Sequence, residues 1–172
     1  IFMENEYFKS VEAEYKKFLE DKSIQEQKSG EKEEETILFI SEPMSESINS
    51  MGDSMNWEYT EYDILENVLK KLNNNGYTGR FVIRMHPAEQ KSKYNEVIEG
   101  SKGSIRVEVS DNKNFYVDIA PSKLVIGMES MGLVIPFLCG KRTISYLPND
   151  NQSCPLPFEE IEKTKDINSI NL

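Results

Sequence analysis

The only histidine of the chain, His86, ends an apolar run and is followed directly by a proline. It lies in the stretch FVIRMHPAEQ, residues 81–90. Pro87 restricts His86 to extended backbone geometry and stops a strand there, so the imidazole is fixed where the strand ends. A histidine at such a position either hydrogen-bonds a backbone carbonyl or binds a phosphate oxygen as a donor. From these residues alone, both roles are open.

An arginine lies close to this histidine in the same predicted strand. Arg84 is two residues before His86, so the two side chains lie on the same strand face. An arginine inside a buried strand needs a partner, because an unpaired buried charge is costly. Arg84 is therefore expected to pair with an acid or to reach a ligand.

A second stretch, IGMESMG at residues 126–132, has the residue types of an anion-binding turn. Ser130 lies where a strand passes into a helix, and a serine there caps the helix. The first-turn amides and the helix dipole then favour a bound anion. Gly127 and Gly132 allow a tight turn and a close approach. The same residues also suit a capped helix without a ligand, and neither a Walker loop nor a G-x-G-x-x-G fingerprint is present.

Apolar runs alternate with helical segments from Thr36 onward. The runs predict strands at 36–42, 80–85, 104–110, 123–128 and 142–147. Helices are predicted at 63–76, 88–100, 112–122, 130–140 and 158–166, and a polar loop at 43–62. Because the strands are buried and alternate with helices, we expect an α/β fold, a Rossmann-like three-layer domain with a mostly parallel sheet.

The first part of the chain has a different character. Apolar residues recur at helical spacing within residues 4–20, and a charged stretch, 21–35, predicts a solvated linker. We therefore divide the chain into an N-terminal helix and linker, 1–35, and a Rossmann-like domain, 36–172. The helix packs either on this domain or on another part of a parent protein, since a chain that begins with Ile1 is expected to be a fragment.

The predicted topology brings the polar stretches together. Ligands of open parallel sheets bind beyond the carboxyl ends of the strands. Glu42 follows the first strand, His86 and Pro87 follow the second, and the turn at 126–132 follows the fourth. Glu129 and Met131 flank the capping serine in that turn. We expect these residues to form one binding site, with no metal among its parts.

Tyr59, Glu61 and Tyr62 form a weaker group within the long predicted loop. Their rings and carboxylate suit a sugar or base pocket. Tyr62 and the nearby Trp57 would suit burial against the sheet equally well.

Composition excludes several classes of function. The net charge of −10 makes the chain a poor nucleic-acid binder, which would need clustered Lys and Arg. No apolar run approaches the roughly 20 residues of a membrane-spanning helix, and no signal peptide is evident. Cys139 and Cys154 lack metal-type spacing, and we expect a reducing, cytoplasmic location. A single histidine without a nucleophile elbow gives no Ser-His-Asp set.

Two stretches together resemble a known family group. VIRMHPAE and DIAPSKLVIGMESMGLVIPFLCGKRTISY look like the C-terminal, nucleotide-binding half of GT-B glycosyltransferases. The nearest in pattern are bacterial sialyltransferases, polysialyltransferases and CDP-glycerol-type transferases, with their His-Pro and serine motifs. The resemblance covers roughly residues 36–150. It implies that His86 and Ser130 contact the phosphate of a CMP- or CDP-linked donor, and that His86 neutralises charge as the nucleotide leaves.

The resemblance also implies what lies outside this chain. In these families the general base belongs to a second, N-terminal Rossmann-like domain, so we expect the chain alone to bind nucleotide weakly and to transfer no sugar. The acceptor would be a glycan or lipid-glycan in surface-polysaccharide or glycoconjugate synthesis. Sialyltransferases often carry two adjacent hydroxyl residues where this chain has Glu129 and Ser130. We therefore predict that Glu129 binds a ribose hydroxyl.

Two other functions fit the same predicted fold. A UDP-sugar 2-epimerase-like enzyme would share the scaffold, although it typically places more acids and histidines in its cleft. A non-catalytic, flavodoxin-like interaction domain is the other alternative. A receiver domain would carry paired acids after its first strand, where this chain has only Glu42.

Overall fold

The protein is built around one parallel sheet. The structure is a computed structural model that describes residues 6–29, 34–51, 58–101, 105–149 and 153–171. Within these residues, six strands pair in the order β3-β2-β1-β4-β5-β6, all of them parallel. They are β1 (Thr36–Ile40), β2 (Arg80–Arg84), β3 (Arg106–Val109), β4 (Ser122–Gly127), β5 (Arg142–Tyr146) and β6 (Glu162–Thr164). The five predicted strands and the Rossmann-like α/β fold are confirmed.

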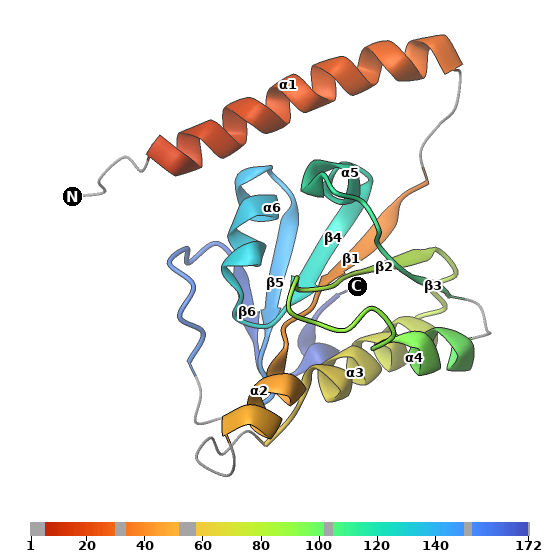
Figure 1. The fold of residues 1–172 in the computed structure, drawn as a ribbon, viewed down its shortest axis with the longest axis vertical. Coiled ribbons are helices and arrows are strands. Elements are labelled where there is room, and N and C mark those ends of the chain that lie inside the picture. Colours follow the sequence, from red (N-terminus) through yellow and green to blue (C-terminus); the bar gives the residue numbers. More distant parts are fainter. Residues whose placement is uncertain (1–5, 30–33, 52–57, 102–104, 150–152, 172) are drawn as a thin grey trace.

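Helices cover both faces of this sheet (Figure 1). On one face lie α3 (Glu61–Asn74) and α4 (Asn95–Gly100), and on the other lie α1 (Glu6–Ser29), α5 (Phe115–Ile119) and α6 (Val134–Leu138). Each face has its own apolar core. Phe39 and Phe81 pack with α3, whereas Leu38 and Val125 pack with α5 and α6. The contiguous burial of β1 follows, because neighbouring side chains of a strand point to opposite faces.

The helix α1 packs on its own domain. Val11 and Tyr15 are buried, and the centroid of the Tyr15 ring lies 5.5 Å from that of Tyr116 in α5. This is one of the two predicted arrangements. The helix also continues to Ser29, through part of the predicted linker. Glu, Lys and Gln are good helix formers, so a charged stretch without a glycine or proline can extend a helix already begun by packing.

The stretch after β1 is also more ordered than predicted. A short helix, α2 (Met44–Met51), occupies the first part of the predicted loop 43–62. Met44 is buried, and Ser47 donates from its backbone and side chain to the carbonyl of Pro43. Part of the loop, 52–57, lies outside the described residues. Loop composition alone did not show that one buried methionine would fix a helical turn.

Two predicted helices are shorter than expected, because particular side chains interrupt them. The segment 88–100 is helical only in α4, because turns carry Glu89 and Lys93 inward. The segment 130–140 forms a 3-10 turn, η2 (Met131–Leu133), and then α6. Pro136 has no N–H to donate to the preceding turn, which prevents a regular helix from the serine onward.

The predicted C-terminal helix at 158–166 is wrong. Residues Glu162–Thr164 form β6, which pairs with the open edge of β5, and η3 (Ile167–Ser169) follows. Arg142 and Glu162 form an ion pair across these strands, with 2.6 Å between Nε and Oε1. The charges that suggested a helix are thus the charged side chains of an edge strand, whose pairing overrides local propensity.

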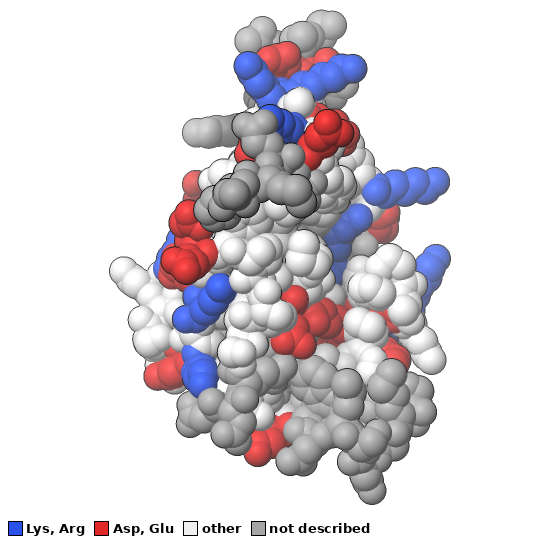
Figure 2. Space-filling view, turned by 90° about the vertical axis from the view of Figure 1, so that its left-hand side faces the viewer, with Lys and Arg blue, Asp and Glu red and all other residues white. Residues whose placement is uncertain are grey.

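The surface charge is distributed rather than concentrated on the face shown in Figure 2. The described Lys and Arg side chains on that face are scattered among acidic and uncharged ones. Such an arrangement offers no basic stripe there that could follow a phosphate backbone. Among the described residues, no helix combines the length and apolar character needed to cross a bilayer.

Candidate functional site

The strand order places a topological switch point between β1 and β4. The chain leaves β1 toward α2 and α3, whereas it leaves β4 toward η2 and α6 on the opposite face. These two neighbouring strands therefore send their connections in opposite directions. In open α/β sheets, this switch point is where ligands bind, outside the carboxyl ends of the strands.

Two glycines let the strand ends approach each other closely. A Cβ on Gly127 would lie 2.9 Å from the Ile40 carbonyl oxygen and 3.1 Å from Leu133 Cδ2. A Cβ on Gly132 would lie 3.2 Å from both Ile40 Cγ2 and Ser130 Oγ. The predicted close approach at these glycines is confirmed, and the neighbour that approaches is β1. Neither glycine has the positive φ of a tight turn that requires glycine.

Ser130 caps the turn that follows β4. Its Oγ accepts a hydrogen bond from the amide of Gly132 at 3.0 Å. The hydroxyl proton remains available to a further acceptor, because a serine hydroxyl both donates and accepts. Met131 lies exposed beside it, with 56% of its surface accessible. The capping role of Ser130 is therefore confirmed, and its hydroxyl can still donate a hydrogen bond.

An internal carboxylate already binds the amides of this turn. Glu42 Oε1 accepts hydrogen bonds from the backbone amides of Glu129 at 2.8 Å and Ser130 at 2.6 Å. Burial raises the pKa of Glu42 to about 7, although the two amides favour its charged form. The amides of the turn thus donate to an acidic oxygen, whereas binding of a ligand anion there stays a prediction. That oxygen belongs to the protein itself, from the strand next to β4.

His86 lies exposed at the end of β2, one strand beyond β1. Its Nδ1 accepts a hydrogen bond from the amide of Ala88 at 3.2 Å. A ring nitrogen that accepts carries no proton, so this bond assigns the proton of the neutral imidazole to Nε2. The backbone amide of His86 donates to Glu89 Oε2. The imidazole therefore presents an N–H donor at the carboxyl edge of the sheet.

Arg84 pairs with an acid, which is one of the two roles expected from the sequence. Its guanidinium bonds Asp118 at 2.5 Å and the Asn112 carbonyl at 2.9 Å, and it lies over the Phe115 ring. Asp118 also accepts from Ser110. These contacts tie β2 to α5 and neutralise the arginine. A direct ligand contact by Arg84 stays a prediction.

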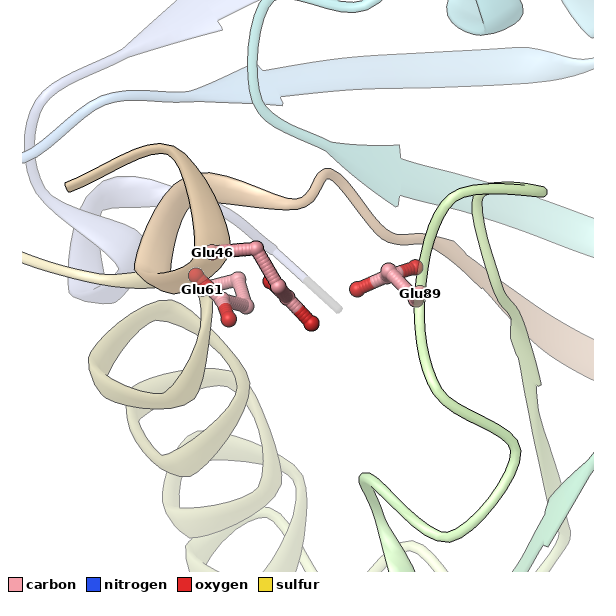
Figure 3. A group of neighbouring side chains, drawn as sticks. All are labelled: Glu46, Glu61 and Glu89. Atoms are coloured by element: carbon pink, nitrogen blue, oxygen red, sulfur yellow. The ribbon is translucent and has the colours of Figure 1, made fainter. Parts of the chain in front are cut away.

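A buried ion cluster near His86 was not predicted. Lys93 Nζ lies 2.5–2.7 Å from carboxylate oxygens of Glu46, Glu61 and Glu89, which come from α2, α3 and the loop after β2 (Figure 3). The oxygens of the three acids lie within 4.8 Å of one another, an arrangement that can hold a cation. Here the cation is the ammonium of Lys93, which is only 3% exposed.

The ion cluster also fixes the ends of β1 and β2. Besides Lys93, Glu89 accepts from Ser41 Oγ at 2.7 Å, from the Tyr94 hydroxyl at 3.1 Å and from the backbone amide of His86. Glu61, expected to line a pocket, is instead buried among these groups. The i,i+4 spacing of Glu89 and Lys93 was the one available sequence signal, and it carried no hint of burial.

The predicted residues thus divide into three sets. Glu42, Gly127, Glu129, Ser130 and Gly132 converge at the switch point, whereas His86 lies one strand away and Arg84 is bound to α5. Comparison of the chain with protein-family models finds no match, and comparison with curated proteins finds none either. The chemistry of the site must therefore be inferred from its own residues.

Proposed function

We propose that this chain is the donor-nucleotide-binding domain of a GT-B-type glycosyltransferase that uses a CMP- or CDP-linked sugar. The observation that carries the proposal is the convergence of polar residues at the switch point. There Ser130 and Glu42 meet between β1 and β4, with His86 at the end of the next strand. This is where the fold binds ligands, and the side chains there offer hydrogen-bond donors.

The spacing of the donors suits a phosphate group. Neighbouring strands lie about 4.8 Å apart, so the ends of β2 and β4 are about 10 Å apart across β1. In the proposed site, the imidazole of His86 and the hydroxyl of Ser130 bind the phosphate from opposite sides. A phosphate between them would accept from Nε2–H and from the serine hydroxyl, and neutralising its developing charge would help the nucleotide to leave.

Glu129 is proposed to bind the ribose. A carboxylate accepts hydrogen bonds from vicinal hydroxyls, whereas it repels a phosphate. Replacing the acid in Glu129→Gln should therefore weaken nucleotide binding in calorimetry. Unchanged affinity would remove Glu129 from the proposed site.

The proposal requires a second domain for catalysis. A GT-B active site forms between two Rossmann-like domains, and the described residues form one sheet. The chain by itself should bind nucleotide and fail to transfer sugar to a glycan or lipid-glycan acceptor. Sugar transfer by the isolated chain would contradict this division of labour.

A nucleotide panel tests the proposal. CMP, CDP, UMP, UDP and GDP are each added to the chain, and binding is observed on the ligand by NMR. Cytidine nucleotides should bind most tightly, and His86→Ala should weaken them, since it deletes an exposed donor without disturbing the core. Lys91→Ala is the matched control, an exposed cation in the same loop. Binding of no nucleotide would contradict the proposal.

One observation favours a different class of function, a non-catalytic interaction domain. The amides that a phosphate could use are already satisfied by Glu42. A turn closed by its own carboxylate needs no ligand to be stable. The nucleotide panel separates the two, because an interaction domain would bind none of the five.

A further inference from the structure

The two oxygens of the Glu42 carboxyl have different surroundings. Both backbone amides, of Glu129 and of Ser130, donate to Oε1. Among the described residues, no hydrogen bond ends on Oε2. A carboxyl group held in this way is asymmetric, since one oxygen is committed as an acceptor and the other is available to carry a proton.

The charges around Glu42 favour the protonated form of its carboxyl group. The carboxylates of Glu129 and Glu89 both act on it with like charge, and the hydroxyl of Tyr59 lies in the same electrostatic environment. The ammonium of Lys93, which is bound by Glu46, Glu61 and Glu89, is not among the groups that act on Glu42. Burial and these neighbours together raise the pKa of Glu42 to about 7. A phosphate bound at the same switch point would add further negative charge.

We propose that Glu42 binds the ligand as a neutral carboxylic acid, with Oε1 accepting from the two amides and Oε2–H donating to a phosphate oxygen. The inference rests on the proposed function and assigns one more residue to its phosphate site. The donors to the phosphate are then Glu42, Ser130 and His86, and the backbone amides serve to orient Glu42. An ionised Glu42 would instead present an unprotected negative oxygen to the ligand.

This role fixes the direction of the pH dependence. A ligand that binds only the protonated form is bound less tightly as the pH rises through the pKa of Glu42, by about tenfold for each pH unit above it. Binding above that pH takes up one proton from the solvent, which becomes the Oε2–H. No covalent bond changes, and no co-reactant is needed.

The substitution Glu42→Gln tests the proposal, because glutamine imitates the neutral acid. Its carbonyl oxygen can accept from the amides of Glu129 and Ser130, and its NH₂ can donate to the phosphate at any pH. CMP affinity is measured by NMR at pH 6 and pH 8 for both proteins. At pH 8 the variant should bind about tenfold more tightly than the wild type, and at pH 6 the two should be nearly equal.

Two features of the design isolate the effect. The second ionisation of the phosphate itself, near pH 6, is common to both proteins and cancels in their ratio. Glu96→Gln is the matched control, because it removes the same charge from an exposed position on α4. The control should follow the wild type at both pH values.

Different results overturn different claims. If the wild type binds CMP and Glu42→Gln binds it with the same pH profile or more weakly at pH 8, the role of Glu42 is wrong and the proposed function stands. If neither protein binds any nucleotide at pH 6, the proposed function fails. Inorganic phosphate, titrated in the same way, then tests Glu42 alone. Tighter binding by the variant at pH 8 supports its role as a donor, and equal or absent binding overturns it.

Discussion

Two groups of carboxylates lie at the carboxyl edge of the same sheet, and they are stabilised in different ways. In the ion cluster of Glu46, Glu61, Glu89 and Lys93, a full positive charge stabilises the acids. At the switch point, the hydrogen bonds that Glu42 accepts within the described residues come from two backbone amides. Partial charges compensate burial less completely than an ammonium does. The first group is therefore suited to fix structure, and the second to change protonation near neutral pH.

The largest expected effect comes from removing the positive charge of the ion cluster. In Lys93→Met, two fully buried carboxylates, Glu61 and Glu89, lose their counter-ion. An uncompensated buried charge costs about 3–5 kcal/mol, so the free energy of unfolding should fall by that amount in urea titrations at pH 7. Lys91→Met, an exposed neighbour, should change it by less than about 0.5 kcal/mol.

A rescue experiment separates charge from packing in this prediction. If unpaired charge causes the loss, adding Glu61→Gln and Glu89→Gln to Lys93→Met should recover part of the stability. Equal stability of Lys93→Met and the wild type would show that the ammonium does not hold the cluster.

The next effect tests how closely β4 approaches β1 at the switch point. Gly127→Ala places a methyl group 2.9 Å from the Ile40 carbonyl, a backbone atom that cannot move aside alone. Overpacking of this kind costs about 1–3 kcal/mol, to be measured as a lower free energy of unfolding. Gly100→Ala is the matched control, because nothing lies within 4 Å of its added Cβ. A stable Gly127→Ala protein would contradict the tight approach.

The two groups also differ in how much of them the sequence predicted. Periodicity identified five strands and most helices, because buried parallel strands are contiguous apolar runs. Ser130, the two glycines and His86 could be proposed from the sequence, because motifs at strand ends are local patterns. The ion cluster was missed, since Glu46 and Glu61 meet Lys93 only after α2 and α3 have packed. The edge strand β6 was missed because its charges matched a helix.

The partner of the Ser130 turn was beyond sequence reasoning as well. Glu42 was expected beside a ligand, but its bonds to the amides of Glu129 and Ser130 depend on which strand lies next to β4. Strand order within a sheet is a property of the whole chain. Local motifs can therefore predict that a turn binds an acidic oxygen and still leave the identity of that oxygen open.

A smaller effect should appear in the pH dependence of stability at the switch point. The pKa of Glu42 is raised from 4.5 to about 7, with burial as the main cause, so the folded protein holds a proton that the unfolded chain releases. The wild type therefore loses stability as the pH rises from 4.5 to 7, and Glu42→Gln does not. Between pH 5 and pH 8 the variant should gain about 1–2 kcal/mol relative to the wild type, after allowance for partial exposure.

Thermal melts of both proteins across this pH range measure the gain. The difference in melting temperature should grow up to about pH 7 and remain constant above it. A constant difference from pH 5 to pH 8 would mean that Glu42 titrates at its ordinary value, and the contrast between the two groups of acids would disappear.

The smallest expected effect is the contribution of Glu46, in the ion cluster, to the pH dependence of stability. Its sign is opposite to that of the contribution of Glu42. Burial opposes the ionisation of Glu46, but its bond to Lys93 outweighs burial and lowers the pKa. A lowered pKa adds stability above 4.5 that is lost as the pH falls through the folded value. Glu46 is 34% exposed, so Glu46→Gln should cost only about 0.5 kcal/mol at pH 7 and nothing near pH 3, as measured by urea titration. If Glu46→Gln and Glu42→Gln shift stability in the same direction with pH, an ammonium and a pair of amides do not differ as proposed. Opposite directions would show that two acids in the same segment after β1 differ in their response to pH because different groups donate to them.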